Sequence, residues 1–271
     1  FKDVPAANYE FKIAMGSWTE NYGVGGIQDG SNYGISVTEK RDVTVYYSDI
    51  SHLAVTDIDY VFADISLEGT GIPEGTMLTD PGLTGIYSAS LALKAGTYGD
   101  LKHTYNEEEF EINEFTLAED KTVTFYFDPV TGIYYNNSSD EQLDEEKIYF
   151  DSKDETYKSI YGAVPTGTEV TFSLDTGNDA QQVKLVLKGK EQQILDMEKT
   201  DGSENAAARW TVTTSFSQYG EYEYYFVVGG ESSVKIYCDD DGYYGTGTTA
   251  DLTQVKPYEM NVYKEGFETP D

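Results

Sequence analysis

The chain carries AANYEFKIA at residues 6–14 and DVTVYYSD at residues 42–49, and the same frame recurs as KAGTYGDLK at 94–102 and KTVTFYFDP at 121–129. Both copies place β-branched and aromatic residues in short alternating runs, a pattern typical of half-buried strands. A frame that recurs within one chain indicates a β-unit that is used twice. These stretches therefore predict consecutive β-units as the basis of the fold.

The first copy contains an insertion, GSWTENYGVGG, at residues 16–26. The second copy has only a short acidic segment at residues 106–114, with neither Trp nor clustered Gly. A frame that folds without the insertion is scaffold, and function is often grafted onto such scaffolds in loops. We therefore expect residues 16–26 to form a ligand loop.

The rest of the chain also has the periodicity of strands. No stretch of a dozen residues shows a convincing helical face, and Gly, Asp and Asn separate the apolar runs. The clearest further strands are expected at residues 43–47, 123–127, 170–174, 183–187, 210–216 and 222–228. The sequence predicts an all-β chain of three consecutive antiparallel sandwiches of the immunoglobulin-like type.

We place the three units at residues 1–55, 56–138 and 139–271. The second unit has roughly 35 residues before its AGTY strand that have no counterpart before AANY, enough for two or three strands. We therefore expect the first unit to be incomplete at its N-terminus. Residues 136–146, NNSSDEQLDEE, are polar and acidic, so we expect a linker or an exposed crossover there.

Acidic residues dominate the charge, because 49 Asp and Glu stand against 18 Lys and Arg and give a formal net charge of -31. Such a surface repels phosphate backbones and anionic lipid, so nucleic-acid and membrane-surface partners are excluded. No apolar run approaches the roughly 20 residues that cross a bilayer. The single cysteine, Cys238, allows no internal disulfide.

Tyrosine is the commonest aromatic residue, with 24 Tyr against 12 Phe and 2 Trp. Its ring has an apolar face and a polar rim, which suits the stacking of sugar rings whose faces are apolar and whose edges carry hydroxyls. The alternative for any single Tyr is strand propensity, which also favours it.

The motif YEFKIAMGSWTENYGVGG at residues 9–26, with the later VTVYY strand, resembles the module that recurs beside the catalytic domain of bacterial amylopullulanases and extracellular amylases. The second copy keeps AGTY and TVTFYFDP without the Trp loop. It is therefore identified as a degenerate member of the same module.

The third unit resembles a different domain. TYKSIYGAVPTGTEVTF at residues 156–172, together with FETPD at 267–271, is similar to the N-terminal, starch-binding-type domain of neopullulanases, cyclomaltodextrinases and related α-amylase-family enzymes. In that family the FETPD-like end leads into the catalytic barrel. This chain has Lys158 and Ile160 where the family often has an arginine and a proline.

Together the resemblances imply a non-catalytic accessory fragment of a bacterial enzyme that degrades starch, pullulan or glycogen, located outside the cell or on its surface. Its expected partners are the α-glucan and the enzyme's own catalytic domain. The alternative is a structural spacer, a domain-packing or an oligomerisation region without sugar binding.

The candidate sugar-binding residues of the loop are aromatic and polar. Trp18 and Tyr22 are expected to form a platform for a glucan ring, with Asn21 and Glu20 bonding its hydroxyls. The loop glycines would let the backbone approach the sugar closely. The alternative is that Trp18 caps the hydrophobic core and the polar run only turns the chain.

The third unit adds Tyr161, Tyr243 and Tyr244 as aromatic candidate binding residues, and the pair at 243–244 is expected to be exposed because it lies in a turn beside Gly242 and Gly245. The pair at 243–244 could instead contact the catalytic domain. Asp239-Asp240-Asp241-Gly242 is an oxygen-rich turn that could hold calcium, but it lacks the spaced ligands and distal Glu of an EF-hand loop. We therefore assign no cofactor and no metal site.

Overall fold

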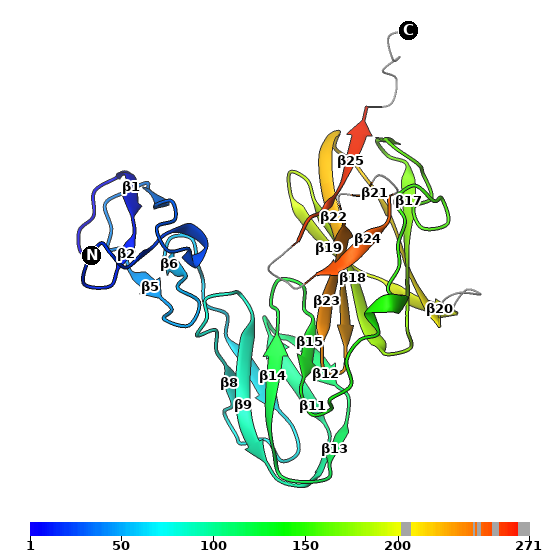
Figure 1. Cartoon of the computed structure of the whole chain (residues 1–271), viewed down its shortest axis with the longest axis horizontal. Coiled ribbons are helices and arrows are strands. Elements are labelled where there is room, and N and C mark those ends of the chain that lie inside the picture. The colour runs from blue at the N-terminus through cyan, green and yellow to red at the C-terminus, as the bar shows by residue number, and fades with distance from the viewer. Residues whose placement is uncertain (202–206, 241, 243–244, 251–254, 265–271) are drawn as a thin grey trace. The chain divides into compact units, whose positions relative to one another are not determined.

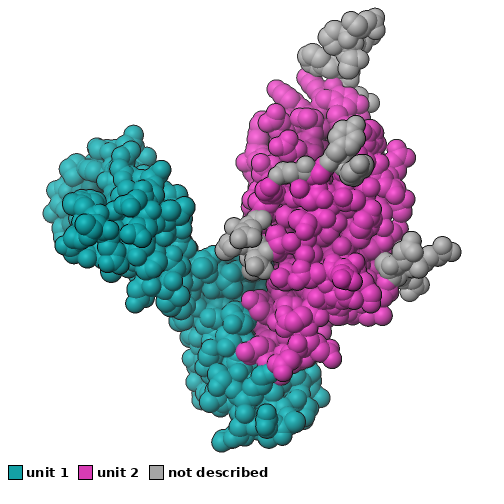
Figure 2. All heavy atoms as spheres, viewed as in Figure 1, with its two compact units in different colours: residues 1–134 teal, residues 135–271 magenta. Residues whose placement is uncertain are grey.

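The computed structural model describes residues 1–201, 207–240, 242, 245–250 and 255–264. The chain forms two compact units, residues 1–134 and 135–271 (Figure 2). Apart from two short 3-10 helices, η1 (Val24–Gly26) and η2 (Glu145–Lys147), the regular structure described here consists of strands (Figure 1). The prediction of an all-β chain is confirmed. In the described ranges, no helix is long and apolar enough to cross a membrane.

The first copy of the repeated frame, which we call repeat 1, is built from three antiparallel strand pairs. The paired strands are β1 (Ala7–Phe11) with β4 (Tyr33–Val37), β2 (Ile13–Ala14) with β3 (Asn21–Tyr22), and β5 (Val45–Tyr47) with β6 (Ala54–Thr56).

The second copy, repeat 2, has longer and more numerous strands. Its four-stranded sheet has the order β12 (Glu108–Ile112), β11 (Leu101–Tyr105), β7 (Ile65–Glu68) and β8 (Met77–Leu78). A three-stranded sheet has the order β15 (Tyr134–Asn136), β14 (Lys121–Phe127) and β9 (Tyr87–Leu93). A further pair joins β10 (Gly96–Tyr98) to β13 (Phe115–Leu117).

The two repeats share one strand register. Tyr9 lies opposite Ile35 in repeat 1, and Tyr98 lies opposite Phe115 in repeat 2. The hydroxyl of Tyr9 donates to the carbonyl of Pro5 and that of Tyr98 to the carbonyl of Lys94, in each case four residues upstream. This local hydrogen bond fixes the entry to a strand in the same way as the tyrosine corner of immunoglobulin-like domains. How the first 138 residues divide into units stays a prediction.

The core of repeat 2 contains one buried imidazole. His103 is 0% exposed on β11, and its ring lies edge-on to the rings of Phe127 and Tyr134. Neither ring nitrogen makes a hydrogen bond of good geometry within the described chain. Burial lowers the pKa of His103 to about 4, and the backbone of Ser66 offsets only part of this effect.

Replacing this imidazole should make the protein more resistant to acid. The folded state keeps His103 neutral down to about pH 4, whereas the unfolded chain takes up a proton near pH 6.5. Stability is therefore lost as the pH falls from about 6.5 to 4, by about 3 kcal/mol in total for this group. We expect His103→Leu to reduce this loss in urea-unfolding experiments between pH 7 and 4, with His52→Gln, a change at the half-buried second histidine, as control. An unchanged pH slope in His103→Leu would contradict the assignment.

Unit 2 is a two-layered sandwich. One sheet has the order β16 (Val164–Pro165), β25 (Tyr258–Tyr263), β22 (Gly220–Gly230), β18 (Ala180–Lys188) and β19 (Gln192–Asp196), with β23 (Val234–Asp239) and β24 (Gly247–Ala250) branching from β22. The other has the order β17 (Glu169–Thr176), β21 (Ala208–Ser215) and β20 (Glu198–Asp201). Neighbouring strands in both sheets are antiparallel except for the β16–β25 pair.

The core of unit 2 lies between these two sheets. Phe172 on β17 contacts Tyr224 on β22 with ring centroids 5.2 Å apart. Trp210 is buried, and its indole nitrogen donates to Thr176 Oγ1 at 3.0 Å. Cys238 is also buried.

The expectation of a linker or an exposed crossover at residues 136–146 holds for residues 140–142 and 144–146, which are exposed, but not for the whole segment. Leu143 is buried in the core of unit 2, and its backbone N–H donates to Ser233 Oγ at 3.0 Å. Asn136 is buried too, and its N–H donates to the carbonyl of Glu231. A single apolar residue such as Leu143 can anchor an otherwise acidic segment when its side chain enters a core. The average composition of residues 136–146 does not reveal such a residue.

Candidate functional site

The predicted ligand loop is the connection of a short hairpin. Ile13 and Ala14 of β2 lie opposite Tyr22 and Asn21 of β3. The N–H of Met15 donates to the carbonyl of Glu20 at 2.9 Å and closes the turn. Trp18 lies at the tip of this turn with 73% of its surface exposed. Its ring is therefore available to a ligand, and the alternative that it caps the core is wrong.

Asn21 holds this tip in place. Its side chain is buried, with only 4% exposed, and its amide donates to the carbonyl of Trp18 at 2.9 Å and to Asp29 Oδ1 at 2.6 Å. Both amide hydrogens are used inside the loop, and the amide oxygen has no partner among the described residues. The structure therefore gives Asn21 a positioning role, and its direct bond to a sugar hydroxyl stays a prediction.

Two of the loop glycines allow neighbouring backbone segments to approach the loop closely. A Cβ on Gly23 would lie 2.1 Å from the carbonyl oxygen of Ser31, and one on Gly26 would lie 2.4 Å from that of Ser51. Gly26 also has a φ of 70°, in the left-handed region that favours glycine. These contacts account for the two glycines without a ligand, and they place residues 51–52 directly against the loop.

Tyr22 is supported from one side by a histidine. Its ring is stacked on the imidazole of His52, with centroids 3.9 Å apart and an interplanar angle of 2°. The Tyr47 hydroxyl lies 2.7 Å from Nδ1 of His52 and orients the imidazole. The Tyr22 hydroxyl donates to Glu20 Oε1 at 3.3 Å, and burial and this carboxylate together raise the pKa of Tyr22.

His52 occupies a position that repeat 2 gives to a glycine. In repeat 1, Ser48 N–H donates to the carbonyl of Leu53, and His52 has a φ of 59°. In repeat 2, Asp128 N–H donates to the carbonyl of Ile133, and Gly132 has a φ of 68°. A non-glycine residue in this conformation costs about 1–3 kcal/mol and tends to occur at functional sites.

Sequence reasoning missed this role of His52. Aligning the turn at residues 48–53 with that at 128–133 would have revealed it, because a histidine then replaces a left-handed glycine. Tyr47 and Asp29 were also missed, since their partners lie 5 and 8 residues away and no local pattern marks them.

The loop thus combines an exposed indole, an exposed carboxylate and a phenol ring stacked on an imidazole. Aromatic faces pack against apolar C–H surfaces, and carboxylate and phenol groups bond hydroxyls. We refer to Trp18, Glu20, Tyr22 and His52 as the loop cluster. This chemistry suits a neutral ligand with apolar faces and hydroxylated edges.

The third-unit candidate Tyr161 lies at the rim of a pocket of about 260 Å³ and is 60% exposed. The ammonium of buried Lys158 donates to the carbonyls of Ile160 and Gly162, at 2.5 and 3.1 Å, on either side of this tyrosine. Burial lowers the pKa of Lys158 to about 8. Lys158 therefore fixes the backbone on both sides of Tyr161. Tyr243 and Tyr244 lie outside the described residues.

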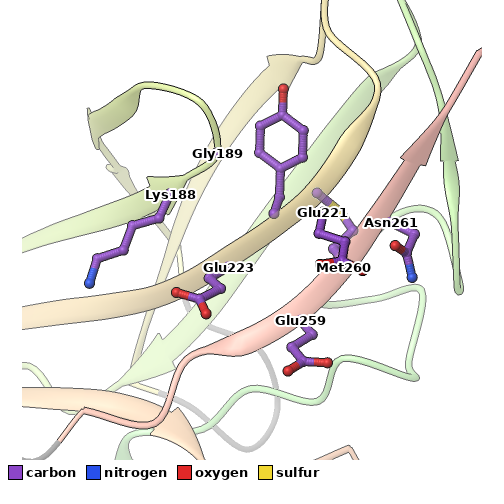
Figure 3. A pocket seen from close by; sticks show the side chains of 8 residues that line it. Lys188, Gly189, Glu221, Glu223, Glu259, Met260 and Asn261 are labelled. Carbon is purple, nitrogen blue, oxygen red and sulfur yellow. The ribbon is translucent and has the colours of Figure 1, made fainter.

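A second pocket of about 440 Å³ shares Glu259, Met260 and Asn261 with this one. Figure 3 shows its polar side chains on adjacent strands. Lys188 lies opposite Glu223, and Glu223 lies opposite Glu259, so the three form a row across β18, β22 and β25. We refer to the two adjoining pockets as the β25 groove. Its amide and carboxylate groups can bond hydroxyls.

The acidic turn at 239–242 is described only in part. Asp240 Oδ1 accepts from the N–H of Gly242 at 2.5 Å, and Asp241 lies outside the described residues. Within the ranges that the structure describes, no group of three or more His, Cys, Asp or Glu side chains is arranged to hold a metal.

Comparison with known proteins relates the loop cluster to a family. Residues 1–54, which include Trp18 and His52, match the family model of the pullulanase X25 domain. The chain is similar to amylopullulanases along almost its whole length. The amylopullulanase of Thermoanaerobacter thermohydrosulfuricus is 24% identical over 99% of this chain and 14% of that protein. That of Thermoanaerobacterium thermosulfurigenes is 25% identical over 99% of this chain and 11% of that protein.

The amylopullulanase of Thermoanaerobacterium saccharolyticum is 23% identical over 99% of this chain and 16% of that protein. The chain thus spans 11–16% of the length of these relatives. The matches confirm the resemblance to accessory modules of amylopullulanases that residues 9–26 predicted. The resemblance of residues 139–271 to neopullulanase-type domains stays a prediction.

The positioning role of Asn21 can be tested by truncation. Asn21→Ala removes both hydrogen bonds of the amide, so we expect the loop to lose about 1–2 kcal/mol of local stability. Amide exchange of residues 15–30, measured by NMR, should accelerate accordingly. Asn32→Ala is the matched control, because Asn32 is exposed and bonds only the Glu10 side chain. Equal exchange in both variants would show that Asn21 does not hold the tip.

Proposed function

We propose that this chain is the non-catalytic, α-glucan-binding part of an extracellular amylase or pullulanase, and that it holds starch, pullulan or glycogen near a catalytic domain of the same polypeptide. The chain is similar to a segment that makes up 11–16% of the length of three amylopullulanases, and this similarity supports the proposal. The match of residues 1–54 to the pullulanase X25 domain supports it further.

The observation that carries the proposal is a convergence within repeat 1. Repeat 1 has two features that repeat 2 lacks at the matching positions: the Trp loop and the histidine in place of Gly132. They are separate in sequence, yet Tyr22 from the loop stacks on His52. Repeat 2 has the same strand register without either feature, so the frame does not require the contact between Tyr22 and His52. A ligand site explains why the two departures meet.

The chemistry of the loop cluster suits a glucose ring. The exposed Trp18 indole offers an apolar face for the C–H surface of a sugar, and Glu20 and the Tyr22 hydroxyl offer hydrogen-bonding groups. One face of Tyr22 is covered by His52, so a sugar would stack only on its other face. The net charge of -31 does not oppose binding, because the polymer is neutral.

The β25 groove supplies a second surface, with Tyr161 at its rim and carboxylate and amide groups along it. Two weak sites on one chain strengthen each other when one polymer reaches both. Avidity then exceeds the single-site affinity by roughly 10² or more. We therefore propose that polymers bind better than short oligosaccharides do.

Trp18→Ala tests the proposed site directly. Removal of a central aromatic contact costs more than 1 kcal/mol at typical binding hot spots, so affinity should fall about fivefold or more. The measurement is affinity electrophoresis in gels that contain amylopectin, pullulan or cellulose. The control variant is Tyr219→Ala, since Tyr219 is a similarly exposed aromatic residue in unit 2, outside both candidate surfaces.

Retardation in the α-glucan gels that disappears in Trp18→Ala and persists in Tyr219→Ala would support the loop cluster. Retardation that persists in both variants would move the site to the β25 groove. If the unaltered chain shows no retardation in any gel, sugar binding is wrong and the spacer or oligomerisation alternative is favoured.

His52→Gly separates the site from the scaffold. Glycine tolerates the left-handed conformation that repeat 2 uses at this position, so strain relief offsets the lost ring contact, and the unfolding free energy should change by less than about 1 kcal/mol. Glucan affinity should nevertheless fall several-fold, because Tyr22 loses its support. The measurements are thermal unfolding and the same gels. Unaltered retardation would remove His52 from the site.

A further inference from the structure

The turn at residues 48–53, which we call the His52 turn, lacks the acidic side chain that closes its counterpart in repeat 2. In that counterpart, the Thr131 hydroxyl donates to Asp128 Oδ2 at 2.5 Å, so the turn is closed by its own side chains. Repeat 1 has Ser48 in place of Asp128 and Ser51 in place of Thr131. The structure gives the hydroxyl hydrogen of Ser51 an acceptor outside the turn.

That acceptor belongs to repeat 2. The Ser51 hydroxyl donates to the backbone carbonyl of Gly82, and both residues lie within unit 1. On its other side, Ser51 packs against the Trp loop, since its carbonyl oxygen occupies the space that a Cβ on Gly26 would need. Ser51 therefore lies between the Trp loop and residues 80–85 of repeat 2, which we call the Gly82 turn.

A buried carboxylate fixes the Gly82 turn. Asp80 is only 5% exposed, and its Oδ1 accepts from the N–H and the hydroxyl of Thr84 at 3.1 and 3.3 Å. Its Oδ2 accepts from the N–H of Gly85 at 2.7 Å and from the Tyr60 hydroxyl at 2.6 Å. Hydrogen bonds to a charged oxygen are stronger than those between neutral groups. The carbonyl that receives the serine hydroxyl is therefore part of a firmly held turn.

Tyr60 extends this support to strand β5. Its ring lies edge-on to that of Phe62, with centroids 5.0 Å apart, and the Phe62 ring lies edge-on to that of Tyr46, with centroids 4.9 Å apart. Tyr46 is the neighbour on β5 of Tyr47, whose hydroxyl orients His52. Two routes thus join the Gly82 turn to the His52 turn, one through the serine hydroxyl and one through these rings.

We propose that repeat 2, which has no Trp loop, supports the loop cluster of repeat 1, and that Ser51 and Asp80 are positioning residues that hold His52 against Tyr22. The left-handed conformation of His52 is costly for a residue with a side chain, so its turn needs contacts that hold it. The Gly82 carbonyl supplies the acceptor that a carboxylate supplies in the other turn. The effect on sugar affinity rests on the function proposed above, whereas the effect on the stacked rings does not.

The test follows the His52 turn by NMR in the full chain, with two readouts. The first is the nuclear Overhauser effect between the stacked rings of Tyr22 and His52. The second is amide exchange at Ser48, whose N–H donates to the carbonyl of Leu53 at 3.0 Å and closes the turn. Exchange at Ser48 is compared with that of the β1–β4 amides, which report on the rest of repeat 1.

Two variants remove the proposed support from opposite sides. Ser51→Ala deletes the donor in repeat 1, and Asp80→Ala deletes the carboxylate that fixes the acceptor in repeat 2. Loss of one hydrogen bond predicts that exchange at Ser48 becomes about two- to tenfold faster and that the effect between the rings weakens. Ser51→Thr keeps the hydroxyl and should behave like the unaltered chain. Thr131→Ala is the matched control, because its hydroxyl bonds within its own turn.

Asp80→Ala is the decisive variant, because Ser51 also accepts from the N–H of Leu53, whereas Asp80 lies outside the His52 turn. Faster exchange at Ser48 relative to the β1–β4 amides, with a weaker effect between the rings, supports the proposal. Unchanged values of both readouts in Asp80→Ala overturn it, whether or not repeat 2 stays folded in this variant.

Retardation in amylopectin gels separates this proposal from the proposed function. If both variants loosen the His52 turn and the unaltered chain is not retarded, the support by repeat 2 stands and sugar binding fails. If the unaltered chain is retarded, Ser51→Ala should be retarded less and Ser51→Thr equally. Equal retardation of the unaltered chain and of both loosened variants would show that neither residue positions the sugar site, and would overturn that part of the proposal.

Discussion

The stability of this chain depends on burying the inward side chains of paired strands, because its one cysteine cannot form an internal disulfide. In unit 2 this burial is complete across two facing sheets, with Phe172, Tyr224 and Phe226 in the centre. In repeat 2 a cluster around Phe125 and Phe127 does the same. Repeat 1 meets the requirement only partly, since Ile35 and Val45 are half-buried. The arrangement of the loop cluster rests on this same frame, because β2, β3 and β5 carry or flank its residues.

The presence of two repeats in one chain separates scaffold from site. The tyrosine hydrogen bond to the carbonyl four residues upstream occurs in both repeats, and so does the turn that follows the VTVYY or VTFYF strand. Features that recur are explained by folding alone. The Trp loop and the left-handed His52 occur in one repeat, and they contact each other through Tyr22. Such a comparison uses no information beyond the chain itself.

Much of the fold could be predicted from the sequence, because alternation of β-branched and aromatic residues is a local signal. The absence of the loop in repeat 2 marked residues 16–26 as an insertion, but the sequence left open whether Trp18 is exposed or caps the core, and the structure decides for exposure. The roles of Asn21 and Gly23 could not be predicted, since they depend on Asp29 and on the carbonyl of Ser31, which approach only in the folded loop. Leu143 escaped notice for a related reason, because one apolar residue among acids gives no periodic signal, although the core of unit 2 receives it.

The way in which the loop tip is fixed has a consequence for how such a module can diversify. The main-chain bond from Met15 to Glu20 and the buried amide of Asn21 hold the turn from below. Among the residues that the structure describes, the side chains of Ser17 and Thr19 bond each other and no group of the frame beneath them. Substitutions at these exposed positions leave the buried contacts intact. Selection can therefore rewrite the recognition surface a few residues at a time, while the part that must fold stays the same.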